Sequence, residues 1–271
     1  MQKVSKIKAG NNLKEAVLKS VDEIGGSTSL TAGGFRKFIK KGETVLLKPN
    51  FNTADPYPAS TDMIFLKAVI EIIYDCGAKL VMVGESSTMY LNSRKEMEKI
   101  GVFDLEKLEK PARVYVFEEK GWTKKEIPDG KFLQKVSVTD ILSRPDKLIL
   151  LPCLKAHKMA QFTGSLKLAI GFMKPLERVH LHLDNLQEKI AELNTLINPD
   201  LIIMDARKCF ITGGPFAGTV REPDLILSSA SRINIDIEGV KVIQSFEGNS
   251  LEGIDPLELP QIKLAKKLGI K

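Results

Sequence analysis

The chain has 271 residues, of which 43% are hydrophobic and 27% charged, and it carries a formal net charge of +6. This length and balance are typical of a folded globular protein and argue against a disordered chain. Aromatic residues make up only 6%, which disfavours a nucleic-acid-binding surface, and no apolar run approaches the roughly 20 residues of a membrane span.

The three cysteines, Cys76, Cys153 and Cys209, are scattered along the chain and form no CxxC pair. They cannot supply the thiolates that an iron–sulfur cluster usually needs, so we expect neither a cluster nor a disulfide framework. Residues 1–6 lead into a polar stretch without the apolar core of a signal peptide. We therefore expect a cytoplasmic protein with reduced thiols and no membrane partner.

The first half of the chain alternates helical and strand-like segments. Helices are predicted over residues 13–21, 35–41, 63–74, 92–100 and 104–109, and strands over 45–47, 80–83 and 113–117. The helix over 63–74 is apolar around much of its surface, so we expect it to be well buried. With the strands on either side it forms a βαβ unit, which is the building block of a parallel sheet.

A hairpin then interrupts this alternation. Residues 124–127 and 135–138 flank Pro128-Asp129-Gly130, whose residue types favour a turn, and this predicts a small excursion around residues 120–140. Further strands are predicted over 148–151, 201–204 and 224–227, and helices over 186–197, 234–246 and 261–268, whereas 162–173 fits a helix or a loop. The pattern predicts a single α/β domain over residues 1–271, with a mostly parallel, doubly wound sheet and helices on both faces.

Four of the predicted parallel strands end abruptly in polar residues. These are Lys48 and Asn50 after the first strand, Glu85 after the second, Lys155 and His157 after 148–151, and Asp205 after 201–204. Open parallel sheets bind their ligands beyond the carboxyl ends of the strands, so these residues should meet in one crevice. Each could also be an ordinary turn, loop or capping residue.

The residue types suggest roles within such a crevice. Lys155 could bind an anion or, if desolvated, act as a base, and His157 could relay protons or bind a metal. Glu85 could be a base or a metal ligand. Asp205 could bind a ligand or simply pair with Arg207.

Other segments could contribute to an anion site. The loop over 213–218 contains Gly213, Gly214 and Gly218, and such a loop can aim backbone N–H groups at an anion, although a tight turn explains it equally well. Basic residues between the strand ends could add positive potential or be solvated surface charges; they are Lys167, Lys174, Arg178, Arg207 and Arg221. His180 and His182 lack a visible third metal ligand.

In order along the chain, the motifs resemble one family. They are VLLKPNF (45–51), VGESS (83–87), LPCLKAHKMAQFTGSLKLAIG (151–171), INPDLIIMDA (197–206) and GGPFAG (213–218), followed by Ile235-Asp236. Together they resemble the domain-of-unknown-function family 362. The resemblance implies functional roles for Lys48, Asn50, Glu85, Lys155, His157, Lys167, Asp205, Gly214 and Asp236.

This chain departs from the family pattern in its cysteines and at Leu168. Many members of this family carry a ferredoxin-like insert with two iron–sulfur clusters, and this chain lacks the cysteines for one. The Ser-Leu-Lys-Asn of the family is Ser-Leu-Lys-Leu here, ending at Leu168. A remote similarity to the nickel-dependent lactate racemases concerns the fold alone, and no residue is carried over from them.

Two hypotheses of function follow. In the first, the protein binds or transforms a small anionic metabolite: Lys48, Lys155 and Lys167 bind the anion, His157 relays a proton, and Glu85 and Asp205 act as base or ligands of a divalent metal. In the second, it is a non-catalytic partner of redox or iron–sulfur enzymes. A homodimer is compatible with either hypothesis, and a nucleic-acid partner is not expected.

Overall fold

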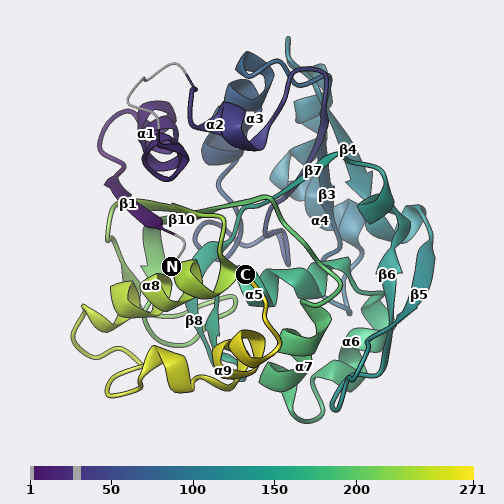
Figure 1. The fold of residues 1–271 in the computed structure, drawn as a ribbon, viewed down its shortest axis with the longest axis vertical. Coiled ribbons are helices and arrows are strands. Elements are labelled where there is room, and N and C mark those ends of the chain that lie inside the picture. The colour runs from purple at the N-terminus through teal and green to yellow at the C-terminus, as the bar shows by residue number, and fades with distance from the viewer. Residues whose placement is uncertain (1–2, 27–31) are drawn as a thin grey trace.

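A computed structural model describes residues 3–26 and 32–271, so Met1 and Gln2 of the predicted polar start lie outside the described residues. Its centre is a twisted sheet with the strand order β1-β12-β10-β7-β2-β3-β4 (Figure 1). These strands are β1 (Val4–Lys8), β2 (Thr44–Lys48), β3 (Leu80–Glu85), β4 (Ala112–Val116), β7 (Lys147–Leu150), β10 (Leu201–Phe210) and β12 (Leu225–Ser229).

The sheet is mostly parallel, as the sequence predicted. Parallel pairing joins β10 to β7, β7 to β2, β2 to β3 and β3 to β4. The strands β1 and β12 form an antiparallel edge beside β10, and β1 was not predicted. Its residues give a poor strand signal because the inward-facing position is Ser5, whose hydroxyl is buried and donates to the carbonyl of Ser20.

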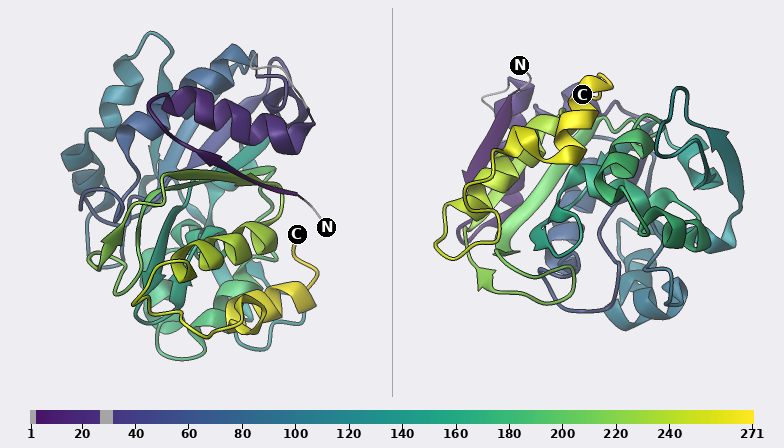
Figure 2. Two further views of the ribbon diagram at one scale, coloured as in Figure 1. Left: turned by 90° about the vertical axis from the view of Figure 1, so that its left-hand side faces the viewer. Right: turned by 90° about the horizontal axis from the view of Figure 1, so that it is seen from below.

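Helices cover both faces of this sheet, which confirms the predicted fold class (Figure 2). One face carries α1 (Leu13–Gly25), α2 (Phe35–Phe38), α3 (Met63–Asp75), α4 (Ser93–Ile100) and the 3-10 helix η1 (Val102–Lys107). The other carries α5 (Ser165–Leu168), α6 (Pro175–Leu181), α7 (Leu186–Leu193), α8 (Arg232–Gln244) and α9 (Pro260–Lys267).

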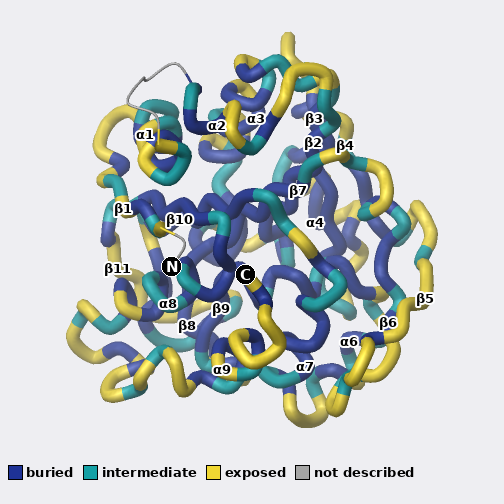
Figure 3. The backbone as a smooth tube through the Cα atoms, viewed as in Figure 1, coloured by how far each residue is buried: buried dark blue, intermediate teal, exposed yellow. Residues whose placement is uncertain are grey.

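The alternation of side chains along each strand explains why the sheet has a hydrophobic core on each face. In β2, Val45 and Leu47 pack into the core under α1 and α3, whereas Leu46 packs into the opposite core, because successive side chains point to opposite faces. Both faces are therefore apolar, and the central strands are buried along most of their length (Figure 3). None of the described helices is long and apolar enough to cross a lipid bilayer.

The predicted helices differ from the observed ones mainly at their ends. Asn12, Asp62 and Asn92 cap α1, α3 and α4 through their side-chain oxygens. The helix predicted over 35–41 stops at Phe38, and 104–109 falls in the 3-10 helix η1. The helix α7 ends at Leu193, four residues before its predicted end, where turns take over.

The hairpin excursion is present. The strands β5 (Trp122–Glu126) and β6 (Lys135–Thr139) form a separate two-stranded antiparallel sheet. Its tip is held by Glu192 of α7, whose carboxylate accepts hydrogen bonds from three successive backbone N–H groups, those of Lys131, Phe132 and Leu133. The short 3-10 helices η2 (Phe117–Glu119) and η3 (Asp140–Ser143) flank it.

The segment that follows β7 contains two strands that were not predicted, and then two short helices within residues 162–173, where the sequence left a helix or a loop open. It forms β8 (Cys153–His157), β9 (Gln161–Thr163), α5 and the 3-10 helix η4 (Ala169–Phe172). The strand β8 pairs with the second half of β10 and with β9. All five residues of β8 are buried, including a lysine and a histidine, and these polar residue types concealed the strand in the sequence. The remaining elements are β11 (Val220–Arg221) and η5 (Pro256–Glu258).

Candidate functional site

A cavity of about 470 Å³ lies where the carboxyl ends of β2 and β3 face β8 and α5. It brings together the candidates that follow the predicted strands β2, β3 and β7, which are Lys48, Asn50, Glu85, Lys155 and His157, and two candidates from other segments, Lys167 and Gly214. Asp205, Asp236, Gly213 and Gly218 are not among its lining residues. Separate parts of the chain meet here because β7, β2 and β3 are neighbouring parallel strands whose carboxyl ends share one sheet edge.

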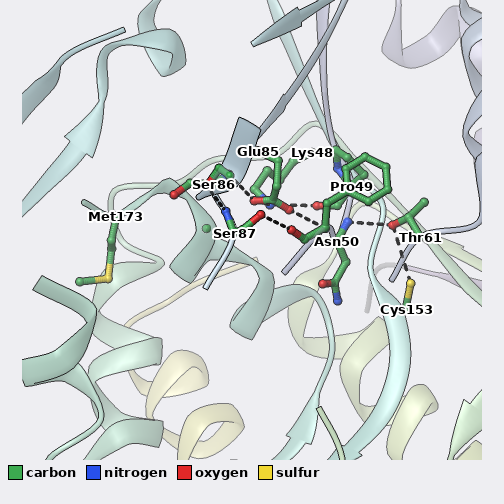
Figure 4. A network of polar contacts seen from close by, with 12 residues as sticks. Lys48, Pro49, Asn50, Thr61, Glu85, Ser86, Ser87, Cys153 and Met173 are labelled. Carbon is green, nitrogen blue, oxygen red and sulfur yellow. Dashed lines mark hydrogen bonds and ion pairs between the residues drawn. The ribbon is translucent and has the colours of Figure 1, made fainter. Parts of the chain in front are cut away.

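Lys48 and Glu85 form a buried ion pair at the floor of this cavity (Figure 4). Lys48 Nζ lies 2.5 Å from Glu85 Oε1 and donates to the carbonyl of Pro49 at 2.8 Å. The two oxygens of Glu85 also accept from the backbone N–H groups of Phe51 and Ser86. Burial lowers the pKa of Lys48, and the charge of Glu85 opposes that shift. The pair is thus satisfied within the protein.

Gly171 makes the close approach to this pair possible. A Cβ atom at that position would lie 2.6 Å from Lys48 Nζ and 2.7 Å from Glu85 Oε1, which is inside any normal contact distance. The backbone of η4 therefore covers the ion pair directly. The signal for this residue was present in the Lys-Leu-Ala-Ile-Gly motif, but its spacing alone did not indicate a contact with Lys48.

Lys155 projects from β8 beneath the loop that joins β2 to α3. Its Nζ donates to the carbonyl of Ala59 at 2.5 Å, and its side chain is 1% exposed. No carboxylate among the described residues forms an ion pair with it. Burial lowers the pKa of Lys155. An ammonium group has three donors, so two remain for a ligand.

The two histidines of the cavity have opposite tautomers. Nδ1 of His157 accepts from the backbone N–H groups of Met159 and Ala160, each at 3.1 Å, which leaves the proton on Nε2. Burial, with the charges of Lys167 and Lys155, lowers the pKa of His157 to about 2. His182 instead donates from Nδ1 to the carbonyl of Arg178, so its Nε2 carries a lone pair.

Lys167 differs from the other cavity cations because the described residues give its Nζ no hydrogen-bond or ion-pair partner. The side chain is half-buried on α5. Burial, reinforced by the charges of Lys155 and Arg178, lowers the pKa of Lys167 to about 7. An amine in this setting exchanges its proton near neutral pH.

Asp236 fixes the helix that carries Lys167. Its carboxylate accepts from the backbone N–H groups of Ser165 and Leu166 and from the Ser165 hydroxyl, at 2.7 to 3.0 Å. Gly164 allows this approach, since a Cβ there would meet Asp236 Oδ1 at 2.4 Å. Burial raises the pKa of Asp236 to about 6. The residue thus positions α5 without lining the cavity.

Asp205 is likewise engaged away from the cavity. It is fully buried, and Arg207 holds it with two hydrogen bonds, from Nε to Oδ1 and from Nη2 to Oδ2. Tyr57 donates its hydroxyl to Oδ1 at 2.7 Å. The contact with Arg207 is the alternative that the sequence left open, whereas the contact with Tyr57 ties the β2–α3 loop to β10.

Arg178 is the remaining buried cation at the cavity. Its guanidinium donates to backbone carbonyls of Ser86, Ser87, Gly171 and Met173 and to the Ser86 hydroxyl. All these partners are neutral. Burial lowers the pKa of Arg178 to about 10. Its donors are occupied, so it contributes charge to the cavity but few free hydrogen bonds.

Two buried, uncharged polar side chains of the cavity wall lack partners among the described residues. The side-chain amide of Asn50 makes no hydrogen bond and points away from the Lys48–Glu85 pair (Figure 4). The hydroxyl of Thr163, on β9, is buried without a partner. Buried polar groups are normally satisfied, so both are available to a ligand. Thr163 was not singled out in the sequence, because a threonine in a strand is unremarkable there.

The glycine loop closes one side of the cavity. A Cβ at Gly214 would lie 2.0 Å from the carbonyl of Ala156, and the residue has a φ of +66°, so only glycine fits against β8. The loop contributes Phe216, which is 45% exposed, to the cavity rim, and Met159, which is 56% exposed, also lines the cavity. The rim therefore includes two large apolar side chains, in contrast to the buried lysines of the cavity.

The described residues offer few groups that could bind a metal ion or react as a thiolate. No cluster of three or more His, Cys, Asp or Glu side chains suited to a metal ion occurs in residues 3–26 and 32–271. Cys76, Cys153 and Cys209 are buried free thiols. Burial raises the pKa of Cys153 to about 11 and that of Cys209 to about 12, so both are protonated at neutral pH.

Fold and cavity together define an α/β protein with a basic site at the carboxyl edge of a parallel sheet. The chain belongs to the family described as Domain of unknown function (DUF362), whose model matches residues 45–241. This confirms the resemblance drawn from the ordered motifs.

Two individual proteins are similar to it. The thylakoid-associated protein sll1697 of Synechocystis is 25% identical over 247 residues, which cover 88% of this chain and 72% of that protein. The lactate racemase apoprotein of Thermoanaerobacterium thermosaccharolyticum aligns in structure with a TM-score of 0.46 and 13% identity, over 85% of this chain. The chain spans 55% of the length of that racemase chain.

Proposed function

We propose that the cavity binds a small organic anion, with the charged end of the ligand between Lys155 and Lys167. The observation that carries this proposal is that neither lysine has a carboxylate partner among the described residues. Burying a cation without a counter-charge is unfavourable, and an anionic ligand relieves that cost. In the same cavity Lys48 already has Glu85 as its carboxylate partner, so that pair carries no net charge to attract an anion.

The wider electrostatics support an anion. Among the described residues that line the cavity, five are Lys or Arg and only Glu85 is acidic. Charge interactions are stronger in a partly desolvated cavity than in bulk water, and a cavity lined by one sign of charge concentrates ligands of the opposite sign. The predicted positive field thus arises from Lys155, Lys167 and Arg178, because Glu85 neutralises Lys48.

Neutral donors would orient the anion. The Nε2–H of His157 and the side-chain amide of Asn50 can each donate to an oxyanion oxygen. His157 acts here as a hydrogen-bond donor, because its lowered pKa keeps it neutral. The lone pair on His182 Nε2 is the better proton acceptor, since its other ring nitrogen is held by a backbone carbonyl.

The apolar residues of the cavity indicate the chemistry of the rest of the ligand. The cavity lining also contains apolar side chains, which are Met89, Met159, Leu168, Ile170 and Phe216. A ligand with an anionic head and a short apolar body would contact both regions. Carboxylates and phosphate monoesters carry suitable heads, since both accept several charge-assisted hydrogen bonds.

The test is a binding screen of small carboxylates and phosphate monoesters, by thermal shift and then by calorimetry. A ligand that binds only the folded state raises the melting temperature. Losing one charge-assisted contact costs about 1.5–3 kcal/mol, so Lys167→Met should weaken each hit roughly ten- to a hundredfold. Lys174→Met is the matched control, because Lys174 is exposed, lies outside the cavity and carries the same charge.

Hits that survive unchanged in both Lys167→Met and Lys155→Met would contradict the proposal. A screen without hits, together with capture of an iron–sulfur protein that depends on the cavity rim, would favour the alternative role as a partner of redox enzymes.

A further inference from the structure

We propose that Lys167 is a nucleophile, and that its amine forms an imine with a small carbonyl compound bearing an adjacent carboxylate, a 2-oxo acid. The inference rests on the proposed function, because the carboxylate is the anion that the cavity binds. It adds a covalent step and identifies the ligand class.

The bonding of the cavity cations singles out Lys167. Lys48 is held by Glu85 and by a backbone carbonyl, and Arg178 has all its nitrogens engaged. Lys155 is anchored to the carbonyl of Ala59. Lys167 alone among these side chains has an amine that no described residue holds. A nucleophilic amine must have a free lone pair, and a lysine held in an ion pair does not.

The surroundings favour the neutral form of this amine. The cavity walls remove water from the amine, Lys155 and Arg178 add like charges nearby, and both effects lower the pKa of Lys167 to about 7. A substantial fraction is therefore unprotonated at neutral pH, whereas an exposed lysine is almost fully charged. The geometry and the protonation state thus agree.

The helix that carries Lys167 is fixed from two sides. Asp236 caps its first turn through three hydrogen bonds, and the buried side-chain amide of Asn194 donates to the carbonyl of Leu166 at 2.8 Å. Both contacts act on residues directly before Lys167. A covalent step needs its reacting atoms held in place, and this support supplies it without blocking the amine.

The step balances without any oxidant or reductant. The Lys167 amine attacks the carbonyl carbon, a C–N bond forms, and the carbonyl oxygen becomes a hydroxyl, giving a carbinolamine. His182 Nε2 carries the first amine proton to the carbonyl oxygen, which makes that hydroxyl, and then carries the second amine proton to the same oxygen, so that the C–O bond breaks and water leaves. The imine then joins Lys167 to the acid. The Nε2–H of His157 polarises the carbonyl, and Lys155 pairs with the carboxylate.

The experiment is reductive trapping with cyanoborohydride, using glyoxylate and pyruvate as probes on the full chain. Reduction of the imine leaves a secondary amine, so the mass increases by that of the acid less one oxygen atom. Peptide mapping should place the adduct on Lys167, and the rate should be half-maximal near pH 7, the pKa of this lysine. Lys174→Met should react like the wild type.

Two variants separate charge from nucleophilicity. Lys167→Arg keeps a cation but cannot form an imine, so it should bind the acid yet lose the trapped adduct. Lys155→Met keeps the amine, so it should still be trapped by a simple aldehyde but lose its preference for the 2-oxo acids. Glycolate, which has the carboxylate but no carbonyl, should block trapping at Lys167 and leave exposed lysines unaffected.

The outcomes distinguish this inference from the proposed function. If glyoxylate and pyruvate bind and raise the melting temperature but leave no adduct on Lys167, the imine is refuted and anion binding stands. If adducts are spread over lysines according to their exposure, with no protection by glycolate, the imine is refuted as well. If the probes neither bind nor react while other anions bind through Lys155, the 2-oxo acid class is wrong. Failure of every anion to bind refutes both.

Discussion

Replacing Glu85 by glutamine would leave Lys48 buried without its counter-charge. Lys48 Nζ lies 2.5 Å from Glu85 Oε1, and the lysine side chain is 1% exposed, so water cannot take the place of the carboxylate. Removing one partner of a buried ion pair typically costs about 3–5 kcal/mol. The backbone donors of Phe51 and Ser86 would also lose a charged acceptor, at roughly 1 kcal/mol each. We therefore expect Glu85→Gln to lower the free energy of unfolding by about 3–5 kcal/mol or slightly more.

The assay is urea unfolding followed by circular dichroism at several pH values, on Glu85→Gln, Lys48→Met and the double variant. The double variant should be less destabilised than the sum of the single ones by at least about 1 kcal/mol, because the two side chains interact directly. Without Glu85 the pKa of Lys48 falls further in the folded state. The deficit should then shrink as the pH rises toward 10.5, where the unfolded chain loses the same proton.

Two results would refute this reasoning. A loss below about 1 kcal/mol in Glu85→Gln would mean that the pair behaves like an exposed salt bridge. Strict additivity in the double variant would mean that the two side chains act independently, whatever their distance.

Two further predictions concern the same cavity. Gly171→Ala would place a Cβ 2.6 Å from Lys48 Nζ, so we expect a loss of about 1–3 kcal/mol, measured as a lower urea midpoint, and an unchanged midpoint would show that η4 can move aside. Lys167 has a pKa of about 7 when folded and 10.5 as its ordinary value, so its contribution to stability is present above pH 10.5 and is lost as the pH falls through 7. Lys167→Met should therefore gain stability relative to the wild type, by a few kcal/mol, as the pH falls over that range. Parallel profiles of unfolding free energy against pH for the two proteins would contradict the lowered pKa.

The sheet and the position of the cavity could be predicted from the sequence because both depend on strong local signals. The apolar runs before Lys48 and Glu85 are short and bounded by polar residues, and parallel strands must end at a common edge. The Pro128-Asp129-Gly130 turn was equally local. These features need no knowledge of which strands are neighbours.

The roles of the individual side chains were not accessible, because they depend on contacts far along the chain. Asp205 and Glu85 both come after an apolar run of the sequence, yet one is held by Arg207 and Tyr57 and the other faces Lys48 in the cavity. The sequence did not indicate β8, because Lys155 and His157 are residue types typical of loops. Both are buried in the structure, where the loop after β2 packs over Lys155. The pattern of apolar residues in the sequence does not show which of these polar side chains faces the cavity.

The difference that matters most is between buried cations that are satisfied and buried cations that are not. Lys48 is held by a carboxylate and Arg178 by carbonyls, so both stabilise the protein as it stands. Lys155 and Lys167 have no counter-charge, so each reduces the stability of the free protein and gains most from a bound anion. Ligand affinity and stability are therefore linked at these two residues: substitutions that remove their charge should stabilise the free protein and weaken binding, whereas substitution of Glu85 should reduce stability by leaving Lys48 without its counter-charge.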